Sequence, residues 1–166
     1  MFTGIKRNLT KTDSKFYEKG VFNMIFVKHY DVTVKNDNGA DVTASLRLTL
    51  GAQIKLKKKY GEDTRSTLFS AAGDDEKLID IVTEALTWNG NTNEIKSGEE
   101  FIERMIDSGD FGIIARQNLV VEIGAASGIF SDKEKTAMLK RVDDMETAML
   151  DGDGVADDVE GTEKNA

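Results

Sequence analysis

The sequence predicts an α+β fold in which an N-terminal β-hairpin packs on a small bundle of about five to six short helices and an acidic C-terminal tail is disordered. Three observations predict this class. Apolar and polar residues alternate between residues 25 and 50, apolar residues take helical spacing from 50 to 150, and acids and glycines dominate 151–166. With 166 residues, 39% of them apolar, the chain can bury the core of one domain, which we place at 24–150.

The hairpin is predicted by two alternating runs on either side of a turn signal. The first run places these residues on one face: Phe26, Lys28, Tyr30, Val32 and Val34. Asn38-Gly39 predicts a tight turn because both residue types tolerate a positive φ. The second run alternates through Val42, Ala44, Leu46, Leu48 and Leu50. A lone hairpin is only marginally stable, so it must pack on the helices or pair with another chain, and its free edges are a candidate association site.

Capping residues and glycines divide the following segment into helices. Thr49 can cap a helix that ends at Gly61, and a short helix over 65–72 ends at Gly73. The next helix has acids at its positive end, and its apolar positions follow the i, i+3, i+4, i+7, i+8 stripe of a core-facing helix. These positions are Leu78, Ile81, Val82, Ala85 and Leu86.

Trp88 is the only tryptophan and lies at the end of that helix. It either binds a partner or closes the core beneath the loop at 89–93, which is the interpretation we favour. Ser97 and Glu100 form a capping-box pattern for the next helix, and Asp110 can cap the one after it. The expected apolar faces of these two helices comprise Phe101, Ile102, Met105 and Ile106, then Ile113, Ile114, Val120, Val121 and Ile123.

A second capping box, Ser131 with Glu134, opens the last predicted helix. Its apolar residues form a narrow seam spaced i, i+4, i+7, i+11, which we call the methionine seam: Met138, Val142, Met145 and Met149. Narrow seams are typical of contacts between helices, and methionine adapts to irregular partners. The sequence leaves two interpretations open, in which the seam binds a partner protein or docks on the protein's own core.

A lysine cluster is the second candidate binding feature. Lys57 and Lys58 lie with Lys59 in the last turn of the helix that follows Thr49. They could dock an acidic segment of a partner. The simpler interpretation is a solvated helix end, where the helix dipole favours cations.

Composition excludes several classes of function. The chain has no cysteine and one histidine, so thiolate metal sites, disulfides and His-based catalysis are not expected. Residues 143–166 contain nine acids and one base, so this segment carries the whole net charge of −8. Residues 1–142 are therefore neutral overall, and we do not expect the chain to bind nucleic acid. Neither a membrane span nor a signal peptide is evident. The run at 151–158 spaces carboxylates like a calcium loop but has Ala156 where an EF-hand needs glycine, so we expect no metal and no cofactor.

Residues 1–23 carry a net charge of +3 and weak periodicity, which predicts a disordered extension. The tetrapeptide at 18–21, Glu-Lys-Gly-Val, can be encoded by codons that contain a ribosome-binding sequence shortly before Met24. This pattern suggests that the native start is Met24. The nucleotide sequence tests the hypothesis.

Between about 24 and 130 the chain resembles the small tail assembly chaperones of long-tailed phages and prophages of Gram-positive bacteria. An alternating segment is followed by GAQIKLKKKYGED, then LIDIVTEALTWNGN, then IKSGEEFIERMIDSGDFG. The resemblance implies a small, mostly helical protein of the host cytoplasm that is absent from the mature virion. Its implied partners are the tape measure protein, which it coats and keeps soluble, and the tail tube subunits that it helps to recruit.

The resemblance brings no catalytic residue and no cofactor, so we do not expect an enzyme. Many phages of this kind make a longer form by a ribosomal frameshift, and an acidic segment such as 151–166 would suit a linker into it. Self-association remains open. Two alternatives also remain: a structural or minor component of the phage tail, and a small regulatory protein-binding module.

Overall fold

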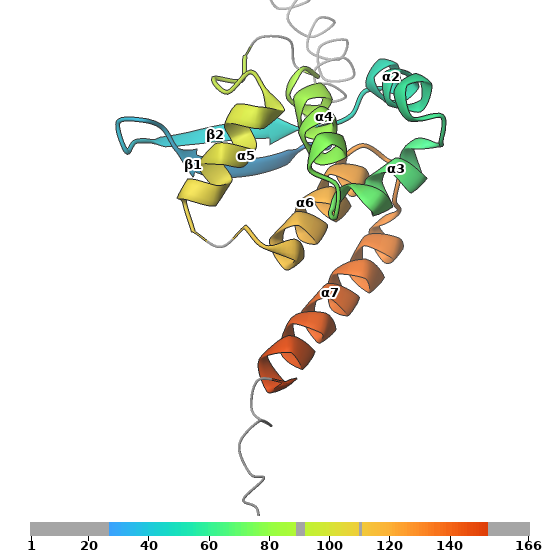
Figure 1. The fold of residues 1–166 in the computed structure, drawn as a ribbon. Coiled ribbons are helices and arrows are strands. Elements are labelled where there is room, and N and C mark those ends of the chain that lie inside the picture. The colour runs from blue at the N-terminus through green and yellow to red at the C-terminus, as the bar shows by residue number, and fades with distance from the viewer. Residues whose placement is uncertain (1–26, 89–91, 110, 153–166) are drawn as a thin grey trace, which may run out of the picture.

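The structure, a computed structural model, describes residues 27–88, 92–109 and 111–152. It confirms the predicted fold class, with a two-stranded antiparallel hairpin followed by six helices among these residues (Figure 1). The elements are β1 (Tyr30–Lys35), β2 (Asp41–Leu46), α2 (Leu50–Tyr60), α3 (Thr64–Ala71), α4 (Asp75–Leu86), α5 (Gly98–Asp107), α6 (Ile113–Ala126) and α7 (Asp132–Gly152). The predicted extension at 1–23 and most of the predicted tail, 153–166, lie outside the described residues.

The hairpin buries the predicted faces around a loop at 36–40. Tyr30 pairs with Leu46, Val32 with Ala44, and Val34 with Val42. The β2 members of these pairs are buried, as is Val34, while Tyr30 and Val32 are half-buried against the core. Gly39 turns the chain with φ 76°, where a side chain would be strained. The hairpin therefore packs on the helices, as its marginal stability alone requires.

Helix α4 lies at the centre of the core. Asp74 caps it by accepting a hydrogen bond from the Lys77 backbone amide. All five predicted stripe residues are at most 2% exposed. The helix contacts β2, α2, α3 and α5, so its apolar stripe is surrounded on several sides (Figure 1). Burial of each of its leucine, isoleucine and valine side chains contributes about 1.5–3 kcal/mol, which makes this stripe a principal source of stability.

Two polar contacts connect distant segments to this core. The Ser127 hydroxyl accepts a hydrogen bond from the Leu48 backbone amide at 2.8 Å and donates to the Ile123 carbonyl, which joins the hairpin exit to the end of α6. Trp88 donates from its indole nitrogen to the Ser45 carbonyl at 2.9 Å and stacks on His29. Trp88 therefore connects the end of α4 to the hairpin.

Two predicted core positions are wrong. Ile106 is 52% exposed and Ile113 is 40% exposed. They lie at the end of α5 and the start of α6, on either side of one connection, where the described residues cover them only in part. Helical spacing identifies the apolar face of a helix but not how far its neighbours extend. Asp110, the predicted cap of α6, lies outside the described residues, and the N-cap position is Gly112.

Candidate partner-binding surfaces

The methionine seam is divided between the core and the surface. Val142 is 6% exposed, and Met138 is half-buried against the core. Met145 and Met149 are exposed by 41% and 52%, and Leu150 by 74%. Both interpretations of the seam therefore hold for different parts of it: its first half docks on the protein's own core, and its second half remains uncovered by the described residues.

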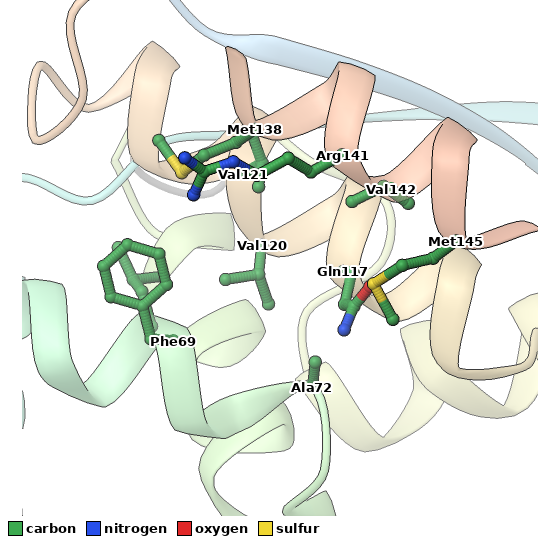
Figure 2. Close-up of a pocket in the computed structure, with 10 residues that line it drawn as sticks. Phe69, Ala72, Gln117, Val120, Val121, Met138, Arg141, Val142 and Met145 are labelled. Carbon is green, nitrogen blue, oxygen red and sulfur yellow. The ribbon is translucent and has the colours of Figure 1, made fainter. Parts of the chain in front are cut away.

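A groove between α3, α6 and α7 lies where the methionine seam passes from buried to exposed residues. It has a volume of about 190 Å³, and we call it the α7 groove. Its lining residues are Leu68, Phe69, Ala72, Gln117, Val120, Val121, Met138, Arg141, Val142 and Met145. Figure 2 shows Met138, Arg141 and Met145 extending from α7 on one side, opposite Phe69 and Ala72 of α3. Phe69 is 57% exposed, so a large aromatic side chain stands at the mouth of the groove.

Gln117 gives the α7 groove a polar feature. Its side-chain oxygen is buried and has no hydrogen-bond partner among the described residues. A buried acceptor without a partner costs about 1–3 kcal/mol, so such groups are rare in folded proteins. The Gln117 side chain lies beside Met145 in the lining of the groove (Figure 2).

Polar contacts hold the first turn of α7 in place. The predicted capping box forms: the Ser131 amide donates to Glu134, and the Glu134 amide donates to the Ser131 hydroxyl. Arg65 of α3 also donates to the Glu134 carboxylate. The hydrogen bonds from Ser131 and Arg65 lower the pKa of Glu134 to about 2. Lys135 pairs with Glu122 of α6 at 2.7 Å. The start of α7 is therefore fixed to α3 and α6.

The lysines of α2 fall into two groups. Lys55 pairs with Glu84, and Lys59 pairs with Asp80 and Glu76 of α4. The predicted site residues Lys57 and Lys58 are exposed and form no ion pair with the described residues. Their positive charge is therefore available to an acidic partner. The dipole of α2 also stabilises lysines in its last turn, so their position does not by itself require a partner.

Side chains occupy part of the hairpin edges, which were a predicted association site. The Ser45 amide donates to Asn93, and the Ser45 carbonyl accepts hydrogen bonds from Asn93 and Trp88. On the other strand, Arg104 donates to the Lys35 carbonyl at 3.0 Å. An added strand would have to displace these contacts, because it needs the same backbone groups. The edges are therefore weaker candidates than the helical surfaces.

The polar cluster nearest to a catalytic arrangement contains Ser45, Asp31 and His29. The Ser45 hydroxyl donates to the Asp31 carboxylate, and His29 lies on the far side of that carboxylate at 3.4 Å. A catalytic triad places the histidine between the hydroxyl and the carboxylate, so that a base can remove the hydroxyl proton. This order is different, because no histidine lies between the Ser45 hydroxyl and the carboxylate. The described residues contain no cluster of histidine, aspartate and glutamate able to hold a metal ion.

Sequence reasoning did not identify several residues of these surfaces. Phe69, Gln117 and Arg141 belong to three different helices, and no local pattern indicates that they meet. Leu50 and Ile54 are 73% and 47% exposed, although alternation had placed Leu50 on the buried face of the hairpin. Leu50 instead begins α2, and its spacing of four from Ile54 could have indicated one exposed helical face.

Comparisons of the chain with protein-family models, with curated proteins and with solved structures gave no match. Within the described residues, no helix is long and apolar enough to cross a membrane.

Proposed function

We propose that this chain is a tail assembly chaperone of a long-tailed phage, which acts in the host cytoplasm and is absent from the mature virion. In this role it binds the tape measure protein, keeps it soluble, and helps to recruit tail tube subunits. The order of sequence elements that resembles this family supports the proposal. The α7 groove, with the exposed half of the methionine seam beyond it, is the observation that carries it.

The shape and chemistry of this surface suit the apolar face of an amphipathic helix, as a long helical tape measure protein would supply. From Met138 to Leu150 the apolar strip is about 18 Å long at 1.5 Å per residue, which equals about three helical turns. Methionine side chains adapt to many partners, which suits a protein that binds successive segments of different sequence. The Gln117 side chain adds a polar group to the lining of the groove.

Charges beside the strip add a condition on the partner. Asp144 and Glu146 flank Met145 on the exposed surface of α7. Adjacent residues of a helix point about 100° apart, so these carboxylates border the strip on both sides. A bound helix that carries lysine or arginine beside its apolar stripe therefore gains attraction as well as apolar contact.

Co-expression tests the proposal. We expect the tape measure protein of the same phage to be largely insoluble alone, and to become soluble and co-purify when this chain is present. Fragments of the tape measure protein with an amphipathic stripe should bind, and fragments with the stripe changed to serine should not. An unchanged soluble fraction and no co-purification would reject the proposal. Assembly of the isolated chain into tubes, seen by electron microscopy, would favour a structural tail component instead.

A further inference from the structure

A second groove lies between α2, the start of α3 and the turn before α7. It has a volume of about 370 Å³, and we call it the α2 groove. Its lining residues are Leu50, Gln53, Ile54, Lys57, Asp63, Thr64, Arg65, Ser127, Gly128 and Ile129. Leu50, Ile54 and Lys57 follow i, i+4, i+7 spacing, so one exposed face of α2 is apolar at its start and cationic at its end.

Together with the adjacent Lys58 and Glu134, this groove holds three cations against two carboxylates. Asp63 accepts hydrogen bonds from the Ser66 amide and hydroxyl as the cap of α3, and Arg65 binds Glu134. Lys57 and its neighbour Lys58 form no ion pair with the described residues. An occupant of this groove should therefore be acidic and should carry apolar side chains that cover Leu50 and Ile54.

We propose that the α2 groove binds the acidic C-terminal segment, 153–166, of a second copy of this chain. The segment has five acids and one lysine. It also contains Val155 and Val159, which are four residues apart, as Leu50 and Ile54 are. Its apolar pair and its acids thus complement both parts of the exposed α2 face.

The reach of the chain explains why the segment comes from a second copy. Helix α7 begins beside the α2 groove, where Glu134 binds Arg65, and extends away from α2 (Figure 1). Its 21 residues span about 31 Å at 1.5 Å per residue. Seven residues separate Gly152 from Val159, and fully extended they cover at most about 25 Å. Val159 therefore cannot return to the groove of its own molecule.

The groove and Gly152, the last residue of α7, lie far apart on each molecule (Figure 1), so the contact is head-to-tail. Every assembly, whatever its length, then keeps one unused groove and one unused tail. Association should then increase with concentration. It should also weaken as salt rises, because exposed charges attract across water and are screened within about 10 Å at 0.1 M salt. The proposal concerns copies of this chain alone and does not depend on any tape measure protein.

Sedimentation equilibrium of the full chain, without a partner protein, tests the proposal. We expect concentration-dependent self-association that is lost on truncation after Gly152, which removes none of the described fold. Lys57→Glu with Lys58→Glu should weaken association at least about tenfold. The matched control, Lys133→Glu with Lys140→Glu, changes the net charge equally on exposed positions of α7 and should leave it unchanged. Thermal unfolding checks that every variant is folded.

Mixing provides the decisive measurement. The truncated chain keeps its groove, and the Lys57→Glu/Lys58→Glu chain keeps its tail. Each should be monomeric alone, and together they should form a one-to-one complex that cannot grow further. Equal association of the full and truncated chains would overturn the proposal, as would the absence of a complex in the mixture. Binding of the 151–166 peptide to the groove variant as tightly as to the unmodified chain would show that the tail docks elsewhere.

Discussion

Helices α4 and α7 were both predicted from apolar spacing, but the molecule uses them differently. All five stripe residues of α4 are at most 2% exposed. Of the four seam residues of α7, only Val142 is buried, and from Val142 onward exposure increases to 41% at Met145 and 52% at Met149. Helix α4 contacts one strand and three helices, whereas the principal neighbour of α7 is α6.

The difference teaches how the width of an apolar stripe relates to burial. The α4 pattern fills a broad face, which needs neighbours on several sides. The seam on α7 is narrow, which suits contact with one helix at a time. Along its first turns that helix is α6, fixed by the capping box and by Arg65. Beyond Val142 the described residues provide no such neighbour, so the same narrow pattern remains available to a partner.

The largest expected effect separates the two helices by stability. Ile81→Ala in α4 removes fully buried methyl and methylene groups, and we expect the free energy of unfolding to fall by about 2–5 kcal/mol. Met149→Ala on α7 should change it by less than about 0.5 kcal/mol, as for most surface substitutions. Urea denaturation followed by circular dichroism measures both. Equal losses would mean that the end of α7 is covered after all.

A smaller effect separates the two halves of α7. Met145→Glu places a charge at an exposed position in the α7 groove, so it should lower affinity for a tape measure fragment at least about tenfold, since the charge would lose water on binding. Its helical circular dichroism should not change. Val142→Glu buries the charge in the free protein and should destabilise the fold itself. If Met145→Glu unfolds the domain, the exposed half of the seam belongs to the core.

The sequence predicts features that depend on residues close together in the chain and misses those that depend on distant residues. The α4 stripe, the Ser97 cap and the capping box at Ser131 depend on residues within a few positions of each other, and all were predicted. The α7 groove combines Phe69 with Gln117 and Arg141 from distant helices, and the α2 groove combines Ile54 with Ile129. Packing brings these residues together, and no local pattern records it. Ile106 and Ile113 were wrong for the same reason.

The smallest expected effect concerns pH and the start of α7. The pKa of Glu134 falls from 4.5 to about 2 in the folded protein, so its contribution to stability is complete above pH 4.5 and is lost as the pH falls through about 2. Glu134→Gln removes this titration and weakens the bond to Arg65. The urea midpoint of the variant should therefore lie below that of the unmodified chain at pH 6, and the difference should shrink towards pH 2.

Glu146→Gln removes an acid from the exposed surface of the same helix and serves as the control. A difference for Glu134→Gln that stays constant between pH 6 and pH 2 would mean that the carboxylate does not bind Arg65 and Ser131 in solution. Docking of α7 would then depend on Val142, its apolar neighbours and the Lys135–Glu122 ion pair. Helix α7 would then differ more from α4, because it would have neither the broad apolar face of α4 nor a charged cap to hold its first turn.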